Sequence, residues 1–115
     1  MPLVHEFGIL DNFDSQKSYD GYTPQKYDCI SVDDDIISSF IDNLSIMKTY
    51  FHSLNRPEQG LAYYGITIIP PESLSLFYDI VTSSRYFKNS DELSELASKI
   101  IQASKDKKYM IHYGI

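Results

Sequence analysis

Residues 31–54, SVDDDIISSFIDNLSIMKTYFHSL, decide the predicted fold because they read as the longest helix of the chain. Their apolar residues recur at intervals of three and four, which places them on one face of a helix with 3.6 residues per turn. These residues are Ile37, Phe40, Ile41, Leu44, Met47, Phe51 and Leu54. Ser31 and Asp34 fit a capping box at the start of this helix.

The remaining sequence predicts further strands and helices around this long helix. We expect strands at residues 3–10, 61–69 and 108–115, a short strand at 25–30, and helices at 72–83 and from about 90 to the lysines at 105–108. The strand at 61–69 is almost continuously apolar or aromatic, which is typical of a central strand covered on both faces. The order β–(β)–α–β–α–α–β predicts one α+β domain over residues 1–115. Its sheet is expected to be antiparallel or mixed, with three to five strands packed with three helices.

A short pattern of an aromatic residue, glycine and isoleucine occurs three times. Its glycines are Gly8, Gly65 and Gly114, and each falls in an expected strand. Glycine inside a strand is typical of a bulge or of the close approach of another backbone. We expect the three glycines to lie side by side in a furrow across the sheet.

Composition and charge narrow the classes of function. The chain of 115 residues has a net charge of −6 and one cysteine, Cys29, so no disulfide within the chain is possible. A single cysteine and the lack of a secretory signal or a long apolar run favour the reducing cytoplasm and no membrane association. Residues 1–55 hold nine acidic residues against three lysines and therefore carry the whole net charge. Direct binding to nucleic acid is disfavoured because it needs clustered Lys and Arg. A basic protein partner is the electrostatic alternative.

The acidic residues of this first half are the candidate binding residues. One carboxylate is enough to cap a helix, yet Asp33, Asp34 and Asp35 are adjacent and repel one another. With nearby tyrosines they predict an acidic, aromatic surface that attracts a basic partner through charge and retains it through aromatic contacts. The predicted partner-binding residues are Asp14, Tyr19, Asp20, Tyr22, Asp28, Asp33, Asp34 and Asp35. The spacings of acids, histidines and cysteine fit no metal site, and we expect no cofactor.

In its size, its acidity and the stretch GLAYYGITIIPPESL at residues 60–74, the chain resembles the small acidic immunity proteins encoded beside bacterial polymorphic toxins, including those of contact-dependent growth inhibition systems. This resemblance implies a non-enzymatic inhibitor in the cytoplasm of the producing cell. The implied partner is one cognate, basic toxin protein, often a nuclease.

Two alternatives come from other residues. His5 and His112 lie in opposite terminal strands that could pair, so a small enzyme or ligand-binding domain using His5, Cys29 or His112 is the main alternative. It requires a pocket that holds these side chains within hydrogen-bonding reach. The end of the chain, HYGI at residues 112–115, is similar to C-terminal tails ending in isoleucine that insert into the active site of cysteine synthase. The competing interpretation of these residues is a packed strand end.

Overall fold

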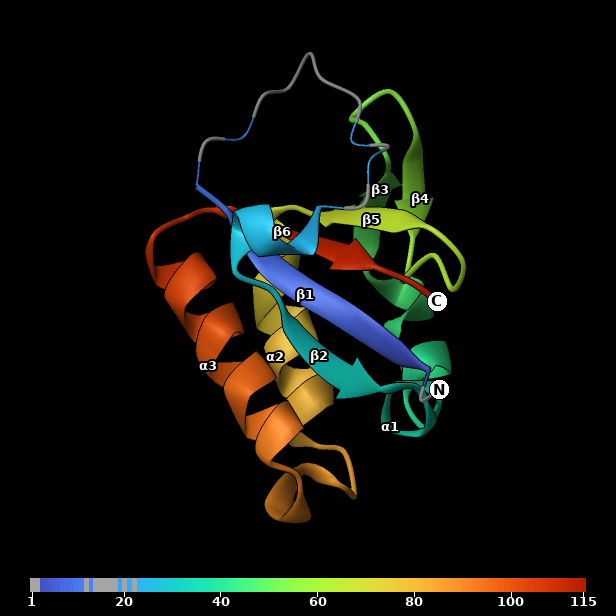
Figure 1. Cartoon of the computed structure of the whole chain (residues 1–115), viewed down its shortest axis with the longest axis vertical. Helices are drawn as coiled ribbons and strands as arrows, with labels where there is room; N and C mark the ends of the chain where they lie inside the picture. Colours follow the sequence, from blue (N-terminus) through green and yellow to red (C-terminus); the bar gives the residue numbers. More distant parts are fainter. Residues whose placement is uncertain (1–2, 12, 14–18, 20, 22) are drawn as a thin grey trace.

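A computed structural model describes residues 3–11, 13, 19, 21 and 23–115. Six strands form one sheet in the order β2-β1-β6-β5-β3-β4, and every neighbouring pair is antiparallel (Figure 1). The strands are β1 (Val4–Leu10), β2 (Ile30–Asp33), β3 (Lys48–Phe51), β4 (Pro57–Gln59), β5 (Ile66–Ile69) and β6 (Tyr109–Tyr113). The α-helices are α1 (Asp34–Ser38), α2 (Leu74–Thr82) and α3 (Asp91–Lys105), and the 3₁₀ segments are η1 (Pro24–Tyr27), η2 (Ile41–Ile46), η3 (Pro71–Ser73) and η4 (Phe87–Asn89).

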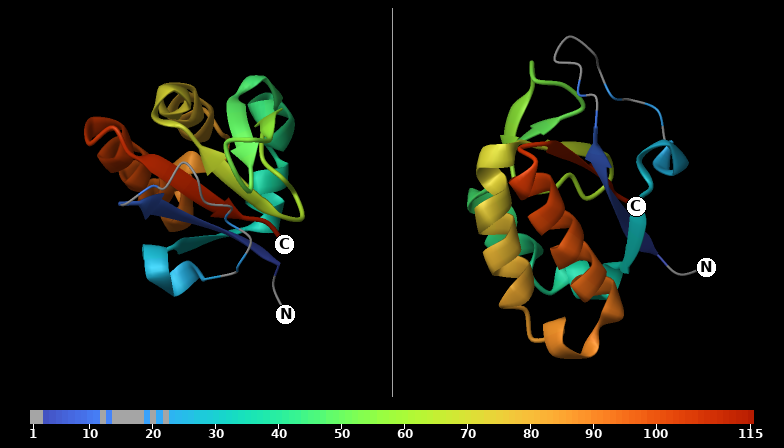
Figure 2. Two further views of the ribbon diagram at one scale, coloured as in Figure 1. Left: turned by 90° about the horizontal axis from the view of Figure 1, so that it is seen from above. Right: turned by 90° about the vertical axis from the view of Figure 1, so that its left-hand side faces the viewer.

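The two faces of the sheet bury different sets of side chains. Helices α2 and α3 lie side by side against one face, and η1 lies on the other side of the sheet (Figure 2). On the helical face, Phe7 and Met110 join a cluster that includes Phe77 of α2 and Ile100 of α3. The second cluster, on the other face, consists of Leu10, Tyr19, Ile66, Ile68, Ile111 and Tyr113, with Phe13, Tyr27, Cys29, Tyr50 and Tyr109 packed against it. Strand β5 is buried along its whole length, as a central strand should be.

The α+β class and the antiparallel sheet are confirmed, but the predicted number of elements is wrong. The described residues form six strands instead of three to five, and four helices of five residues or more, α1, η2, α2 and α3, instead of three. Strand β4 accounts for part of the difference, because none of the expected strands covers Pro57–Gln59, yet this segment pairs with β3 at the edge of the sheet. Proline is tolerated on an edge strand because the outer side of such a strand needs no N–H donor. The short strand expected at residues 25–30 is instead η1, and β2 begins at Ile30.

The predicted long helix at residues 31–54 is also wrong. Helix α1 ends after Ser38, η2 follows, and Lys48–Phe51 forms β3. The capping box is absent as well, since Ser31 lies in β2 and Asp33 caps α1 by accepting a hydrogen bond from the Asp35 amide at 2.8 Å. Intervals of three and four are compatible with a 3₁₀ segment, in which side chains three residues apart share a side. The apolar stripe is therefore buried at Ile37, Leu44 and Met47 although no single helix carries it.

The glycines expected to lie in one row are offset in the sheet. The Gly114 amide donates to the Gly65 carbonyl at 2.7 Å, whereas Gly8 stands opposite Ile111. Gly114 is nevertheless a point of close approach, because a Cβ atom there would collide with the carbonyl oxygens of Tyr63 and Ala62. The Ile115 amide donates to the Tyr63 carbonyl at 2.9 Å, so the end of the chain is packed against the loop before β5.

We expect Gly114→Ala to lower the free energy of unfolding by about 1–3 kcal/mol, since the added methyl group must displace backbone atoms. Gly21→Ala is the matched control, because no heavy atom lies within 4 Å of a Cβ built at Gly21. Urea unfolding of the wild type and both variants measures the effect. Equal stability of the two variants would contradict the close packing at Gly114.

Candidate functional site

Two buried histidines meet on the helical face of the sheet. The strand register aligns His112 of β6 with Phe7 of β1 and with Thr67 of β5, and His5 lies two residues before Phe7 on the same face. His5 Nδ1 and His112 Nε2 are 2.8 Å apart, and neither side chain is exposed to solvent. The two rings are stacked, with centroids 5.1 Å apart. Pairing of the terminal strands therefore brings these two residues together.

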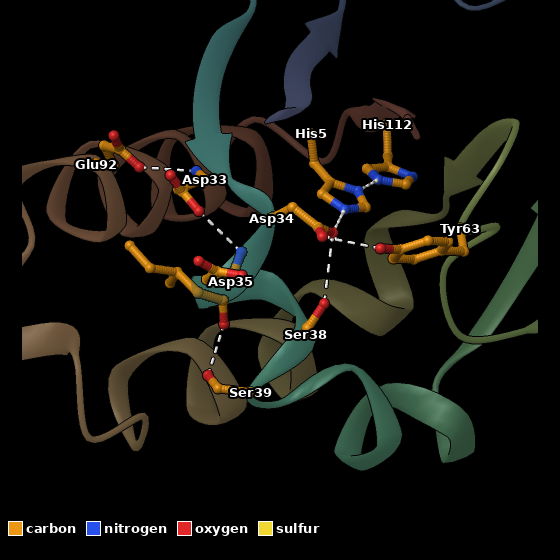
Figure 3. Close-up of polar contacts among 10 residues, drawn as sticks. His5, Asp33, Asp34, Asp35, Ser38, Ser39, Tyr63, Glu92 and His112 are labelled. Atoms are coloured by element: carbon orange, nitrogen blue, oxygen red, sulfur yellow. Dashed lines mark hydrogen bonds and ion pairs between the residues drawn. The ribbon is translucent and has the colours of Figure 1, made fainter. Parts of the chain in front are cut away.

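The histidine pair belongs to a longer chain of hydrogen bonds that continues through Asp34 to Tyr63 (Figure 3). His5 Nε2 is 2.8 Å from Asp34 Oδ1, and the Tyr63 hydroxyl donates to Asp34 Oδ2 at 2.8 Å. At the inner end, His112 Nδ1 is 3.2 Å from the Thr67 hydroxyl oxygen, which accepts the Ala62 amide at 2.8 Å. The five side chains of His5, Asp34, Tyr63, Thr67 and His112 are called the histidine network below.

The geometry determines which atom donates in each hydrogen bond of the network. An ionised Asp34 only accepts hydrogen bonds, so His5 Nε2 donates and His5 Nδ1 carries no proton. His112 Nε2 then donates to His5, and His112 Nδ1 accepts from the Thr67 hydroxyl. With both imidazoles neutral, every ring nitrogen has a partner of the correct type. The network thus satisfies two fully buried polar rings without a buried cation.

The network also shifts the acidity of its members. The hydrogen bond from His5 is the main reason that the pKa of Asp34 is lowered, and the Tyr63 hydroxyl adds to this effect. The same bond to Asp34 raises the pKa of Tyr63. Burial, together with the charge that His5 can carry, holds the pKa of His112 well below its ordinary value. Asp34 is therefore ionised at neutral pH, and His112 is uncharged.

Around Asp34 the network emerges at a surface that combines carboxylates with exposed aromatic and apolar side chains. The side chain of Asp34 is 14% exposed, whereas Tyr64 is 79% exposed and packs edge-on against Tyr63. The Leu3 carbonyl accepts the Asp34 amide at 2.9 Å, and Leu3 is 56% exposed. The Asp33 amide donates to Glu92 at 2.8 Å, which adds a carboxylate from α3. We call this region the acidic-tyrosine surface, and its residues are Leu3, Asp33, Asp34, Asp35, Tyr63, Tyr64 and Glu92.

The structure brings together only some of the predicted binding residues. Asp33, Asp34 and Asp35 meet at the start of α1, but Asp28 lies beyond the opposite end of β2, where it ends η1. Tyr19 is only 5% exposed and stacks on Phe13 in the second cluster, so its ring offers little area to a partner. The remaining predicted residues, Asp14, Asp20 and Tyr22, lie outside the described residues.

Sequence reasoning missed the other members of the acidic-tyrosine surface. Tyr63 and Tyr64 lie in the expected strand at 61–69, but β5 begins only at Ile66. Gly65 was a usable signal, since glycine often stands where a strand is interrupted. No local signal links Glu92 to Asp33, which is 59 residues earlier in the chain.

Cys29 lies apart from the histidines. It packs with the second cluster, on the face of the sheet opposite His5 and His112, and its sulfur is 2.7 Å from a Cβ built at Gly8. Burial, followed by the charge of Glu6, raises the pKa of Cys29 to about 12. A thiol with this pKa stays protonated at neutral pH and is a poor nucleophile. The structure therefore forms no couple between Cys29 and a histidine.

A groove of about 770 Å³ lies between η2 and the C-terminal half of α2. Its lining includes the apolar side chains of Phe40, Ile46, Leu76 and Ile80 and the charged side chains of Asp42, Asp79 and Arg85. Ile46 is 70% exposed. The groove is separate from the histidine network, since neither histidine lines it.

Within the described residues, no group of three or more His, Cys, Asp or Glu side chains is arranged to hold a metal ion. No helix in that part of the chain has the length and apolar character needed to cross a membrane. Comparison with models of known protein families gives no match, and comparisons with curated proteins and with solved structures also give none.

Replacing Asp34 by Asn removes the charge that accepts hydrogen bonds from His5 and Tyr63. We expect Asp34→Asn to lower the free energy of unfolding at pH 7 by about 1–3 kcal/mol. Because the pKa of Asp34 is lowered in the folded chain, this stabilisation is present above the ordinary value of 3.8 and is lost as the pH falls through the folded value. Urea unfolding of the wild type and the variant from pH 7 to pH 3 measures the difference.

Asp35→Asn is the control for this experiment. It neutralises the neighbouring exposed carboxylate and should change stability by no more than about 0.5 kcal/mol. If the two variants lose the same stability, the hydrogen bonds of Asp34 do not stabilise the fold.

Proposed function

We propose that this protein is a non-enzymatic immunity protein that binds and neutralises a cognate bacterial toxin domain through the acidic-tyrosine surface. The observation that supports this most directly is that Asp34, between Asp33 and Asp35, accepts the hydroxyl of Tyr63, whose ring packs edge-on against the exposed ring of Tyr64. Carboxylates beside an exposed aromatic ring are the combination that a basic protein partner requires.

Charge and apolar contact would contribute to binding at different stages. A net charge of −6, with carboxylates clustered at the start of α1, attracts a basic partner at long range and raises the association rate. Tyr64 and Leu3 are exposed and become desolvated on contact, which slows dissociation. The partner class that fits best is a nuclease domain, because its cleft binds a polyanion and clustered carboxylates present a similar charge. Such an inhibitor would act in the cytoplasm of the producing cell.

The competing enzymatic function has little support from the geometry. A general base must reach its substrate, yet His5 and His112 are fully buried. Their ring nitrogens are occupied by each other, by Asp34 and by Thr67. Cys29 lies on the other face of the sheet and has a raised pKa.

Co-expression with the product of the neighbouring gene tests the proposal. We expect a stable complex whose association rate falls about tenfold in Asp35→Lys at low salt, since this variant reverses a charge within the surface. Tyr64→Ala should increase the dissociation rate about tenfold or more, because it removes an exposed aromatic anchor. Stopped-flow or surface-based kinetics at two salt concentrations measure both rates.

Asp106→Lys is the matched charge control. Asp106 is exposed at the C-terminal end of α3, roughly 20 Å along the helix from Glu92 at 1.5 Å per residue. Asp106→Lys changes the net charge as much as Asp35→Lys does, but it should slow association with the partner far less. Equal slowing in the two variants would show that net charge alone attracts the partner. The absence of a complex would overturn the proposed function.

A further inference from the structure

We propose that the histidine network makes the acidic-tyrosine surface sensitive to pH: the surface keeps its form while both buried imidazoles are neutral, and it loosens when the pair takes up protons. The effect on a partner rests on the proposed function. The effect on the free protein does not, and it can be measured without a partner.

The network joins the segments that form the surface. His5 comes from β1 and His112 from β6, while Asp34 begins α1 and Tyr63 belongs to the loop before β5 (Figure 3). Helix α1 has only five residues, and the loop has no strand pairing of its own at Tyr63 and Tyr64. Side-chain hydrogen bonds to Asp34 therefore act together with the backbone bonds from Asp34 to Leu3 and from Ile115 to Tyr63 in fixing α1 and the loop relative to the sheet.

The pair of imidazoles has room for one proton between the facing nitrogens. With both rings doubly protonated, two N–H groups would point at each other across 2.8 Å, in a site from which water is excluded. The first added proton already disturbs the inner end. His5 would donate from both nitrogens, so His112 would have to donate from Nδ1 to Thr67. The Thr67 hydroxyl oxygen would then accept two hydrogen bonds, one from His112 Nδ1 and one from the Ala62 amide. The Thr67 hydroxyl hydrogen would lose its acceptor, because His112 Nδ1 accepts it only when that nitrogen carries no proton.

Charged and uncharged neighbours lie at opposite ends of the histidine pair. From the start of α1, the Asp34 carboxylate faces His5, and from the loop before β5 the Tyr63 ring lies 5.5 Å from the His5 ring. On the strands, the titratable group facing each histidine is the other histidine. The uncharged neighbours are Thr67 of β5 and Phe7 of β1, behind which Phe77 of α2 is packed. The charged partner is therefore at the His5 end, while His112 lies against the Phe7 ring and the Thr67 hydroxyl group.

The sign of the pH effect follows from His112. Its pKa is lowered in the folded chain by burial and by the charge of His5, so the unfolded chain binds more protons below the ordinary value of 6.5. The free energy of unfolding therefore falls as the pH decreases from about 6.5 towards the lower folded value. The hydrogen bonds that depend on the neutral pair are those of the network, so local opening is expected there before the rest of the sheet opens.

Nuclear magnetic resonance of the free protein tests this inference. At pH 7.5 we expect the ring nitrogen signals to report a protonated Nε2 and an unprotonated Nδ1 on both His5 and His112. Between pH 7.5 and 5.5, protection against exchange should fall about tenfold, after correction for the intrinsic rate, at the amides of Asp34 and Ala62, which donate to the Leu3 carbonyl and to the Thr67 hydroxyl oxygen. This factor is about the ratio of charged to neutral imidazole at pH 5.5 in an opened chain, where His112 has the ordinary pKa of 6.5. Titration of His112 at the ordinary value of 6.5, with unchanged amide protection, would overturn the inference.

Two variants separate the histidine pair from general effects of acid. His112→Gln removes the buried titrating ring and keeps an N–H donor, so the loss of amide protection at pH 5.5 should disappear. His52→Asn is the control, because His52 lies outside the network and its backbone φ of 68° is one that Asn tolerates. His52→Asn should keep the full response to pH. If His112→Gln does not fold, the tautomers and protection of the wild type still decide the inference.

Binding of the toxin domain at pH 7.5 and 5.5 tests the link to the proposed function. We expect about tenfold weaker binding at pH 5.5 for the wild type and for His52→Asn, and no such change for His112→Gln. Equal affinity at both pH values, with the expected loss of protection, overturns the link to binding and leaves the proposed function intact. No binding at either pH overturns the proposed function and the link together, while the resonance data decide the effect on the free protein separately.

Discussion

The pairing of β1 with β6 is the constraint on which the rest of the structure depends. It places the two ends of the chain next to each other inside the sheet, with Gly8 opposite Ile111 and Phe7 opposite His112. Strand β5 then pairs with the other side of β6, and both hydrophobic clusters form across these three strands. The same register brings His5 and His112 together. Burying a polar ring without hydrogen-bond partners costs several kcal/mol at the upper end of measured values. The pairing of β1 with β6 therefore requires a hydrogen-bond partner for each of the four ring nitrogens of His5 and His112.

The histidine network meets that requirement by linking the sheet to less regular segments. Two apolar side chains at these positions could pack without hydrogen bonds, and such replacements are often neutral or stabilising. They would remove the hydrogen bond between His5 and Asp34, which links α1, and through the Tyr63 hydroxyl the loop before β5, to the sheet. A fully satisfied polar network fixes one arrangement of its parts more narrowly than apolar contact does. The buried histidines are thus better explained by the placement of the surface than by stability alone.

The sequence predicts the elements whose patterns have a single interpretation. Helix α3 has a Ser90 cap, which accepts the Leu93 amide at 3.2 Å, and an apolar stripe of helical period. Residues 31–54 were mispredicted because intervals of three and four suit both an α-helix and a 3₁₀ segment, and the pairing of β3 with β5 depends on distant residues. The acidic part of the surface was predictable from charge at Asp33, Asp34 and Asp35. Its connections to His5, Tyr63 and Glu92 span 29 residues or more and leave no local pattern.

The three adjacent aspartates have different physical roles, which explains why three are useful where one would cap the helix. Asp33 is the cap, since it accepts the Asp35 amide. Asp34 is mostly enclosed, and the hydrogen bonds from His5 and Tyr63 keep its carboxylate ionised and fixed. These bonds already offset the cost of desolvating the carboxylate, so a partner that covers Asp34 does not have to supply that compensation. Asp35 is exposed and can turn towards a cation on a partner. The acidic-tyrosine surface therefore combines a preorganised carboxylate, Asp34, with an adaptable one, Asp35. The preorganised carboxylate is the one that is hydrogen-bonded to the buried histidine pair.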